Sequence, residues 1–319
     1  MQTINKNWAT DEANKRSWMH KNSLYRENFE HASCGVGMVV SIEGKPSRKV
    51  VELGIDALKA IWHRGAVDAD GKTGDGAGIH VQIPVSFFYD QIERTGHKPR
   101  KDELMAVGQV FLPRADFGAQ ETCRSIVETE VLRMGYYIYG WRHVPVKTDC
   151  LGEKANATRP EIEQILISNS KGVDQDTFER ELYVIRRRIE KSASQAGVSQ
   201  LYLASLSCRS IIYKGMMLAE QVAVFYPDLC DERFTSTFAI YHQRYSTNTF
   251  PQWWLAQPFR MLAHNGEINT LKGNVNWMKS HEIRMASSAF GEMADDIKPI
   301  IPGGSSLSLI HISEPTRLA

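Results

Sequence analysis

The chain has 319 residues, of which 42% are hydrophobic and 24% are charged, as in ordinary globular proteins. Its 38 basic and 37 acidic side chains leave a formal net charge of +1, so no overall field attracts it to nucleic acid or to a membrane surface. No apolar run approaches the roughly 20 residues that span a bilayer. The five cysteines are scattered, without the spacing of a disulfide framework or a cysteine zinc site. We therefore expect a cytoplasmic protein that binds neither nucleic acid nor membrane.

The hydrophobic pattern predicts mixed strands and helices. Strands are predicted at 34–42, 79–83, 105–112, 136–145, 162–168, 200–208 and 236–245, and helices at 48–62, 119–134, 176–195 and 269–285. Because several strands follow one another directly, the order favours α+β layers over strict βαβ alternation. The polar stretch 146–160 is expected to be an insertion or a surface excursion.

The motif His-Ala-Ser-Cys-Gly-Val-Gly at 31–37 places Cys34 at the start of a predicted strand. A thiol becomes a good nucleophile when a base lies beside it, and the α-amino group of an N-terminal cysteine, with a pKa of about 8, is such a base. Residues 1–33 resemble neither a secretory signal nor a transit peptide, and they fit a leader that is cut off before Cys34. The alternatives are a solvated N-terminus and a cysteine that is merely a small core residue.

A glycine-rich segment at 63–78 contains Gly71-Lys72-Thr73. A phosphate-binding P-loop needs glycine at position 66, which is Ala66, and a strand before the loop, where a helix is predicted. We therefore interpret the segment as a tight loop packed close to another backbone or to a ligand. A purely structural turn is the alternative.

Two further motifs combine polar groups next to predicted strands. Arg244 in His-Gln-Arg-Tyr-Ser-Thr-Asn-Thr-Phe-Pro (242–251) could hold a carboxylate through two parallel bonds, although an arginine after a strand is often only a surface residue. Asn265-Gly266 offers an amide and a backbone N–H that suit an oxyanion, although it could equally be a simple turn. Four histidines lack the spacing of metal ligands and are expected to be core or loop residues: His63, His242, His264 and His281.

Together and in this order, the four motifs resemble the class II glutamine amidotransferases, and within that family the glutamate synthase large subunit, over about residues 30–304. The resemblance implies the N-terminal-nucleophile (Ntn) hydrolase fold, an α+β four-layer αββα sandwich. It implies hydrolysis of L-glutamine, with Cys34 as nucleophile and Asn265 and Gly266 holding the oxyanion. Arg244 would bind the glutamine α-carboxylate, with Thr247 and Asn248 in the same loop.

The resemblance also implies a division of the chain into a leader or propeptide at 1–33 and an amidotransferase domain at 34–305. Residues 306–319 depart from the family pattern, where an acidic contact for the glutamine α-ammonium is expected, and they fit a non-native tail. An uncut chain should be inactive, because the amine of Cys34 would be part of a peptide bond. Without the acidic contact, an inactive truncated fragment is an alternative.

In the family, ammonia passes to downstream synthase domains that use FMN and an iron–sulfur cluster to aminate 2-oxoglutarate. A small NADPH-oxidising subunit is a further possible partner. We expect no cofactor and no metal within this chain itself. The alternative enzyme is another class II amidotransferase, which would deliver ammonia to a different acceptor.

Overall fold

The computed structural model describes residues 8–26, 35–246, 250–264, 271–284 and 288–300. The chain divides into two compact units, Met1–Cys34 and Gly35–Ala319. In the first unit the described residues form helix α1, Trp8–Asn22, with Asp11 in its first turn and Lys21 in its last turn. These charges suit the helix dipole. Apolar residues do not recur at helical spacing there, so the hydrophobic pattern did not predict this helix.

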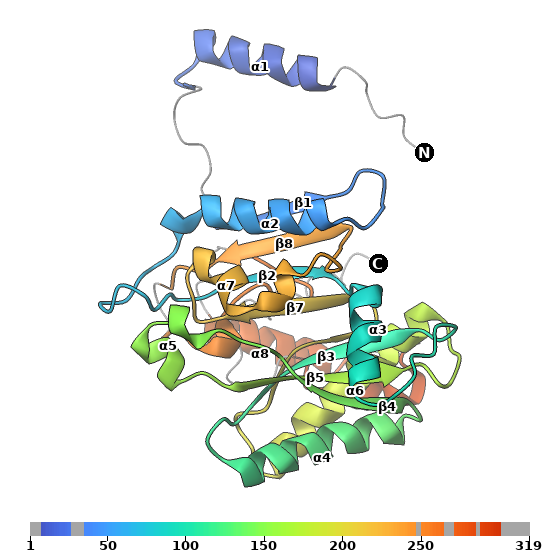
Figure 1. Cartoon of the computed structure of the whole chain (residues 1–319). Coiled ribbons are helices and arrows are strands. Elements are labelled where there is room, and N and C mark those ends of the chain that lie inside the picture. The colour runs from blue at the N-terminus through green and yellow to red at the C-terminus, as the bar shows by residue number, and fades with distance from the viewer. Residues whose placement is uncertain (1–7, 27–34, 247–249, 265–270, 285–287, 301–319) are drawn as a thin grey trace. The chain divides into compact units, whose positions relative to one another are not determined.

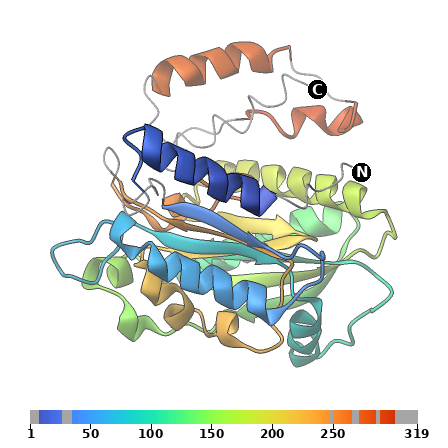
Figure 2. The same ribbon diagram turned by 90° about the horizontal axis from the view of Figure 1, so that it is seen from above.

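The first sheet contains four antiparallel strands in the order β1-β8-β2-β7 (Figure 1). Their bounds are Val36–Val40 for β1, Phe238–Gln243 for β8, Ala77–Gln82 for β2 and Ser210–Gly215 for β7. His242 of β8 lies opposite Val36 on one side and opposite Gly78 on the other. Segments about 200 residues apart in the sequence therefore run side by side, as Figure 2 shows from above.

The second sheet is also antiparallel, in the order β4-β5-β3-β6. Its strands are Tyr137–His143 for β4, Glu161–Ser168 for β5, Met105–Leu112 for β3 and Tyr202–Ser207 for β6. Strand β3 is buried on both faces, because Val107 and Phe111 join one apolar core and Val110 and Leu112 join another. This period of two is the expected pattern of a strand between two layers.

Helices cover the two sheets (Figure 1). Helix α2, Arg48–Ala60, packs on β8 and β1 with Val51 and Leu58 fully buried. Helices α4, Phe117–Arg133, and α6, Gln175–Gln195, pack on the second sheet and enclose the other apolar core. The order helix, sheet, sheet, helix confirms the predicted α+β αββα sandwich. The shorter helices are α3 (Val85–Arg94), α5 (Glu153–Ala157), α7 (Val222–Phe225) and α8 (Leu271–Glu282).

The predicted elements agree with most of the structure, and the main differences besides helix α1 concern β7, α3 and the stretch 146–160. Strand β7 and helix α3 were not predicted, the first because the charged Lys214 interrupts its apolar run and the second because it is only ten residues long. The stretch 146–160 is not a surface excursion: it contains α5, and Leu151 and Ala155 are buried in the core. Trp253 Nε1 donates to the Ala155 carbonyl at 3.0 Å, which ties this stretch to the body of the domain.

A buried polar network joins the two sheets. Arg142 of β4 donates two parallel bonds of 2.7 Å to the Asp228 carboxylate, and Tyr213 of β7 donates a third of 2.9 Å. Gln164 of β5 and Gln91 of α3 accept further bonds from Arg142 at 2.8 Å. Burial acts to lower the pKa of Arg142, but the Asp228 carboxylate outweighs burial and raises it. The network therefore holds a charged pair in the interior, between elements of both sheets.

Candidate functional site

The end of strand β8 is the point where the predicted site motifs converge. The Gln243 amide donates to the Gly35 carbonyl at 2.6 Å, and the Arg244 amide donates to the Gly76 carbonyl at 2.8 Å. Because β8 lies between β1 and β2, its last residues contact the start of both strands. Three of the motifs therefore meet where strand β8 ends: the residues that follow Cys34, the glycine-rich segment and the start of the 242–251 segment.

Arg244 is half-buried at this edge. Its Nη2 lies 3.4 Å from Ser246 Oγ, and the Ser246 amide donates to Asp75 Oδ2 at 2.6 Å. Burial lowers the pKa of Arg244, against the attraction of the Asp75 carboxylate. Burial also raises the pKa of Asp75, against the Ser246 amide and Arg244. A guanidinium stays charged at neutral pH even so, and a partly desolvated one binds a small carboxylate more strongly than an exposed one.

The glycine-rich segment is a closed loop. Asp70 Oδ1 accepts bonds from the Lys72 and Thr73 amides at 2.9 and 2.7 Å, and Asp70 Oδ2 accepts one from Thr73 Oγ1 at 2.5 Å. Hydrogen bonds that nearby backbone amides donate to an aspartate side chain stabilise such turns. These bonds also lower the pKa of Asp70 to about 2. The loop is therefore held in shape by its own side chains.

Two glycines of this segment lie directly against other backbone. A Cβ on Gly74 would stand 2.5 Å from the Met217 carbonyl carbon and oxygen. A Cβ on Gly78 would stand 2.6 Å from the Gln257 carbonyl oxygen and from Lys214 Cβ. This confirms the interpretation of the segment as a loop packed close to another backbone.

Two side chains hold the backbone of His264, the residue before Asn265. His242 Nε2 lies 2.9 Å from the His264 carbonyl oxygen, and Gln257 Nε2 lies 3.0 Å from the same oxygen. Gln257 Oε1 accepts a bond from the His264 amide at 2.9 Å. Both polar groups of one backbone residue are thus bonded to side chains rather than to a sheet or helix. We call His242, Gln257 and the backbone of His264 the His264 clamp.

The segment that leads into Gln257 is held by a buried lysine. Lys214 is fully buried, and its Nζ lies 3.0 Å from the Trp254 carbonyl, 2.8 Å from the Ala256 carbonyl and 3.0 Å from Tyr202 Oη. Burial lowers the pKa of Lys214 well below its usual value. The bonds fix residues 254–256 against the first sheet.

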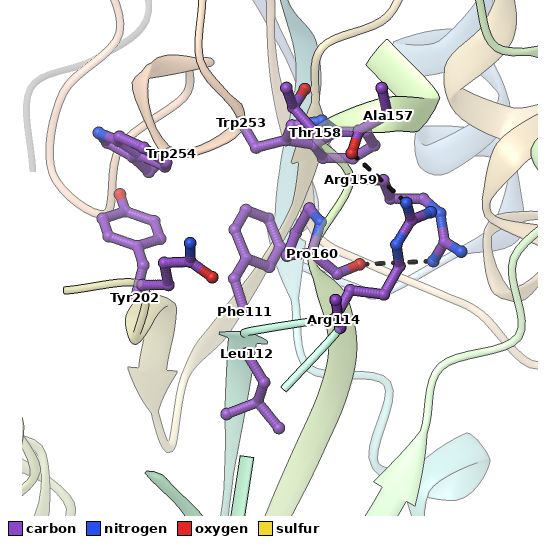
Figure 3. A pocket seen from close by; sticks show the side chains of 12 residues that line it. Phe111, Leu112, Arg114, Ala157, Thr158, Arg159, Pro160, Tyr202, Trp253 and Trp254 are labelled. Carbon is purple, nitrogen blue, oxygen red and sulfur yellow. Dashed lines mark hydrogen bonds between the residues drawn. The ribbon is translucent and has the colours of Figure 1, made fainter. Parts of the chain in front are cut away.

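A cavity of about 400 Å³ lies beside Trp253 and Trp254 (Figure 3). Its walls combine aromatic side chains with two arginines: Phe111, Tyr202, Trp253, Trp254, Arg114 and Arg159. Each arginine donates to a carbonyl of the rim at 3.4 Å, Arg114 to Ala157 and Arg159 to Pro160. The lining contains no residue of 242–246 or 257–264, so the cavity is separate from the end of β8.

Of the six residues predicted for the site, the structure describes only Arg244. Cys34, Thr247, Asn248, Asn265 and Gly266 lie outside the described residues, and their roles stay predictions. Sequence reasoning missed three residues that the structure places around Arg244 and His264: Asp75, Gln257 and Lys214. Asp75 could have been found, because an acid between two glycines of a constrained loop is a noticeable signal. Gln257 and Lys214 carry no local signal, since their partners are distant backbone groups.

Metal ligands, membrane-spanning helices and cysteines remain to complete the picture of the described residues. Among them, no group of three or more His, Cys, Asp or Glu side chains is placed to hold a metal ion. In the same part of the chain, no helix is long and apolar enough to cross a membrane. Cys123, Cys150, Cys208 and Cys230 are free thiols.

A family model and the individual relatives of this chain point to the same family. Residues 34–311 match the family described as glutamine amidotransferases class-II. The chain is 66% identical over 284 residues to the glutamate synthase [NADPH] large chain of Azospirillum brasilense, which covers 89% of this chain and 19% of that protein. It is 42% identical over 292 residues to the glutamate synthase [NADPH] large chain of Bacillus subtilis (strain 168), covering 90% and 19%. It is also 42% identical over 271 residues to the chloroplastic ferredoxin-dependent glutamate synthase of Spinacia oleracea, covering 85% and 17%.

The chain thus spans about a fifth of the length of these relatives. The match begins at Cys34 and extends over most of the remaining residues, and the two antiparallel sheets between helical layers are the architecture that the resemblance implied. The chain belongs to the class II glutamine amidotransferases.

Proposed function

We propose that residues 34–305 form the glutaminase domain of a glutamate synthase, which hydrolyses L-glutamine to glutamate and ammonia. The observation that supports it most is the convergence at the end of β8. Gln243 bonds Gly35, which follows the proposed nucleophile, and His242 contacts the His264 carbonyl just before the proposed oxyanion pair. Arg244, the proposed carboxylate binder, comes next in the chain after Gln243. One strand end thus gathers the chain neighbours of the groups that the proposed hydrolysis needs.

In the proposed reaction, residues 1–33 are first removed, which frees the α-amine of Cys34. The amine takes the thiol proton, and sulfur attacks the side-chain amide carbon of glutamine. The Asn265 amide and the Gly266 N–H stabilise the resulting oxyanion. The C–N bond then breaks, and the amine returns its proton to the leaving ammonia. Water attacks the glutamyl thioester, the C–S bond breaks, and glutamate leaves.

Arg244 is proposed to bind the α-carboxylate of glutamine, together with Thr247 and Asn248. Its partial burial strengthens such a pair, because charges interact more strongly away from bulk water. The bond between the Ser246 amide and Asp75 holds Ser246 next to Arg244 in the sequence that leads to Thr247 and Asn248. The carboxylate would therefore meet a preformed site.

The rest of the synthase is proposed from the relatives, which are several times longer than this chain. Ammonia would pass to downstream domains that carry FMN and an iron–sulfur cluster. It can react there only if it stays unprotonated, which requires a path away from solvent. The described residues contain no cluster of side chains that could hold a metal centre. The reaction steps above use neither FMN nor an iron–sulfur cluster. A cytoplasmic location, a small NADPH-oxidising partner and the 306–319 tail belong to the same proposal.

The test measures ammonia release from glutamine by the chain cut before Cys34. Cys34→Ser should abolish release and also labelling by a diazoketone analogue of glutamine, while Cys230→Ser, at an exposed free thiol, should leave both unchanged. Arg244→Met should raise KM roughly 30-fold or more, since losing one partner of such a charge pair costs about 2–5 kcal/mol. A cut chain that is neither active nor labelled, or an uncut chain with full activity, would refute the proposal.

A further inference from the structure

The His264 clamp is more than a core contact. His242 is 1% exposed and Gln257 is 6% exposed, so the bonds that hold His264 are shielded from water. A carbonyl oxygen can only accept, and therefore His242 carries its proton on Nε2, the nitrogen that faces the His264 carbonyl. With that proton engaged, His242 Nε2 is a donor and not a base. The Gln257 amide bonds both backbone groups of His264, as a neighbouring strand would.

The clamp stands on rigid elements. His242 belongs to the central strand β8, and Gln257 follows Ala256, whose carbonyl Lys214 of β7 holds at 2.8 Å. Gly78 of β2 lies against the Gln257 carbonyl, at a distance that leaves no room for a Cβ. The backbone of His264 is thus tied to three strands of the first sheet.

We infer that His242 and Gln257 are positioning residues for ammonia release, because they fix the backbone that enters the Asn265-Gly266 pair. The inference rests on the proposed function. Donors to an oxyanion act fully only when they are held to within about 0.5 Å of the right place. His264 is bonded to Asn265, so loosening it displaces a donor that matters in the transition state. Glutamine binding, which is assigned to Arg244, does not depend on it.

The experiment compares four variants of the chain that begins at Cys34. His242→Leu and Gln257→Leu remove the bonds to His264, and His242→Gln keeps a donor at similar reach. His80→Leu is the matched control, since His80 is a buried histidine of the neighbouring strand β2 whose ring packs edge-on against Phe238 at 5.5 Å. Two experiments are made on each variant: amide hydrogen exchange of the peptide 258–268, and steady-state kinetics that give kcat and KM for glutamine.

We expect His242→Leu and Gln257→Leu to speed exchange in this peptide at least about tenfold and to lower kcat about 100-fold, the usual effect of a misplacement of about 1 Å. KM should stay within about threefold of its original value. His242→Gln should recover most of kcat, and His80→Leu should resemble the parent in both measurements.

Unchanged exchange in His242→Leu would overturn the clamp, whatever the turnover. Faster exchange with unchanged kcat, or an equal loss in His80→Leu, would overturn the positioning role. A parent chain without ammonia release would instead count against the proposed function, and the exchange measurement would still decide whether the clamp exists.

Discussion

The buried pair Arg142–Asp228 gives a sharp prediction about what joins the two sheets. Both side chains are largely buried, 11% and 4% exposed, and they form two parallel bonds of 2.7 Å. Asp228→Leu removes the carboxylate and leaves a guanidinium in the interior. Removing one partner of a buried pair typically costs about 3–5 kcal/mol. Gln164 and Gln91 still accept bonds from Arg142, so we expect a loss near the lower end, about 3 kcal/mol.

The double variant Arg142→Met with Asp228→Leu should be more stable than Asp228→Leu alone. The reason is that two apolar side chains leave no buried charge, and replacing a buried pair by apolar groups is often neutral or stabilising. The pair is therefore predicted to set the alignment of the two sheets more than their stability. Comparing the single and the double variant separates two contributions to stability: the cost of leaving Arg142 buried without its partner, and the net contribution of the pair.

The measurement is the free energy of unfolding in urea at neutral pH, followed by tryptophan fluorescence and compared at equal slopes. Glu43→Gln is the control, because Lys45 and Glu43 form an ion pair that is 80% and 75% exposed, and its loss should be barely measurable. A loss below about 1 kcal/mol in Asp228→Leu would refute the reasoning. So would a double variant at least as destabilised as the sum of the two single variants.

Two further predictions concern stability. Burial lowers the pKa of His80 from 6.5 to about 4, so as the pH falls through this range the unfolded chain takes up a proton that the folded chain does not. Stability should therefore fall by up to about 3 kcal/mol between pH 6.5 and pH 4, and urea unfolding of His80→Leu should lack this part of the loss; parallel pH profiles would contradict it. Gly74→Ala should lower stability by about 1–3 kcal/mol, because its Cβ would meet the Met217 backbone at 2.5 Å. Gly118→Ala in helix α4, with only an ordinary contact at 3.4 Å, should be neutral or stabilising when both glycine variants are compared by urea unfolding.

Local patterns predicted most of the elements. Strand β3 coincides with the predicted 105–112, and α6 agrees to within one residue with 176–195, because long apolar repeats leave little choice of period. The failures came where tertiary contacts override local pattern. Lys214 is a charged residue in the apolar pattern of β7, and it therefore speaks against a buried strand. In the structure its ammonium group is buried because it donates to the carbonyls of Trp254 and Ala256. The 146–160 stretch looks like a polar excursion, yet Leu151 and Ala155 find partners in distant elements.

The candidate site divides in the same way. The sequence by itself determined the motifs, their order and the family, because the residues proposed as nucleophile, carboxylate binder and oxyanion donors stand in short runs around 34, 244 and 265. Only the tertiary structure decided that the end of β8 brings Gly35, Arg244 and the His264 backbone together, and that Gln257 and His242 hold the last of these. The physical reason is that such bonds join side chains to backbone groups far away in the sequence. A backbone group has the same chemistry at every residue, so no local pattern marks which one will be bonded.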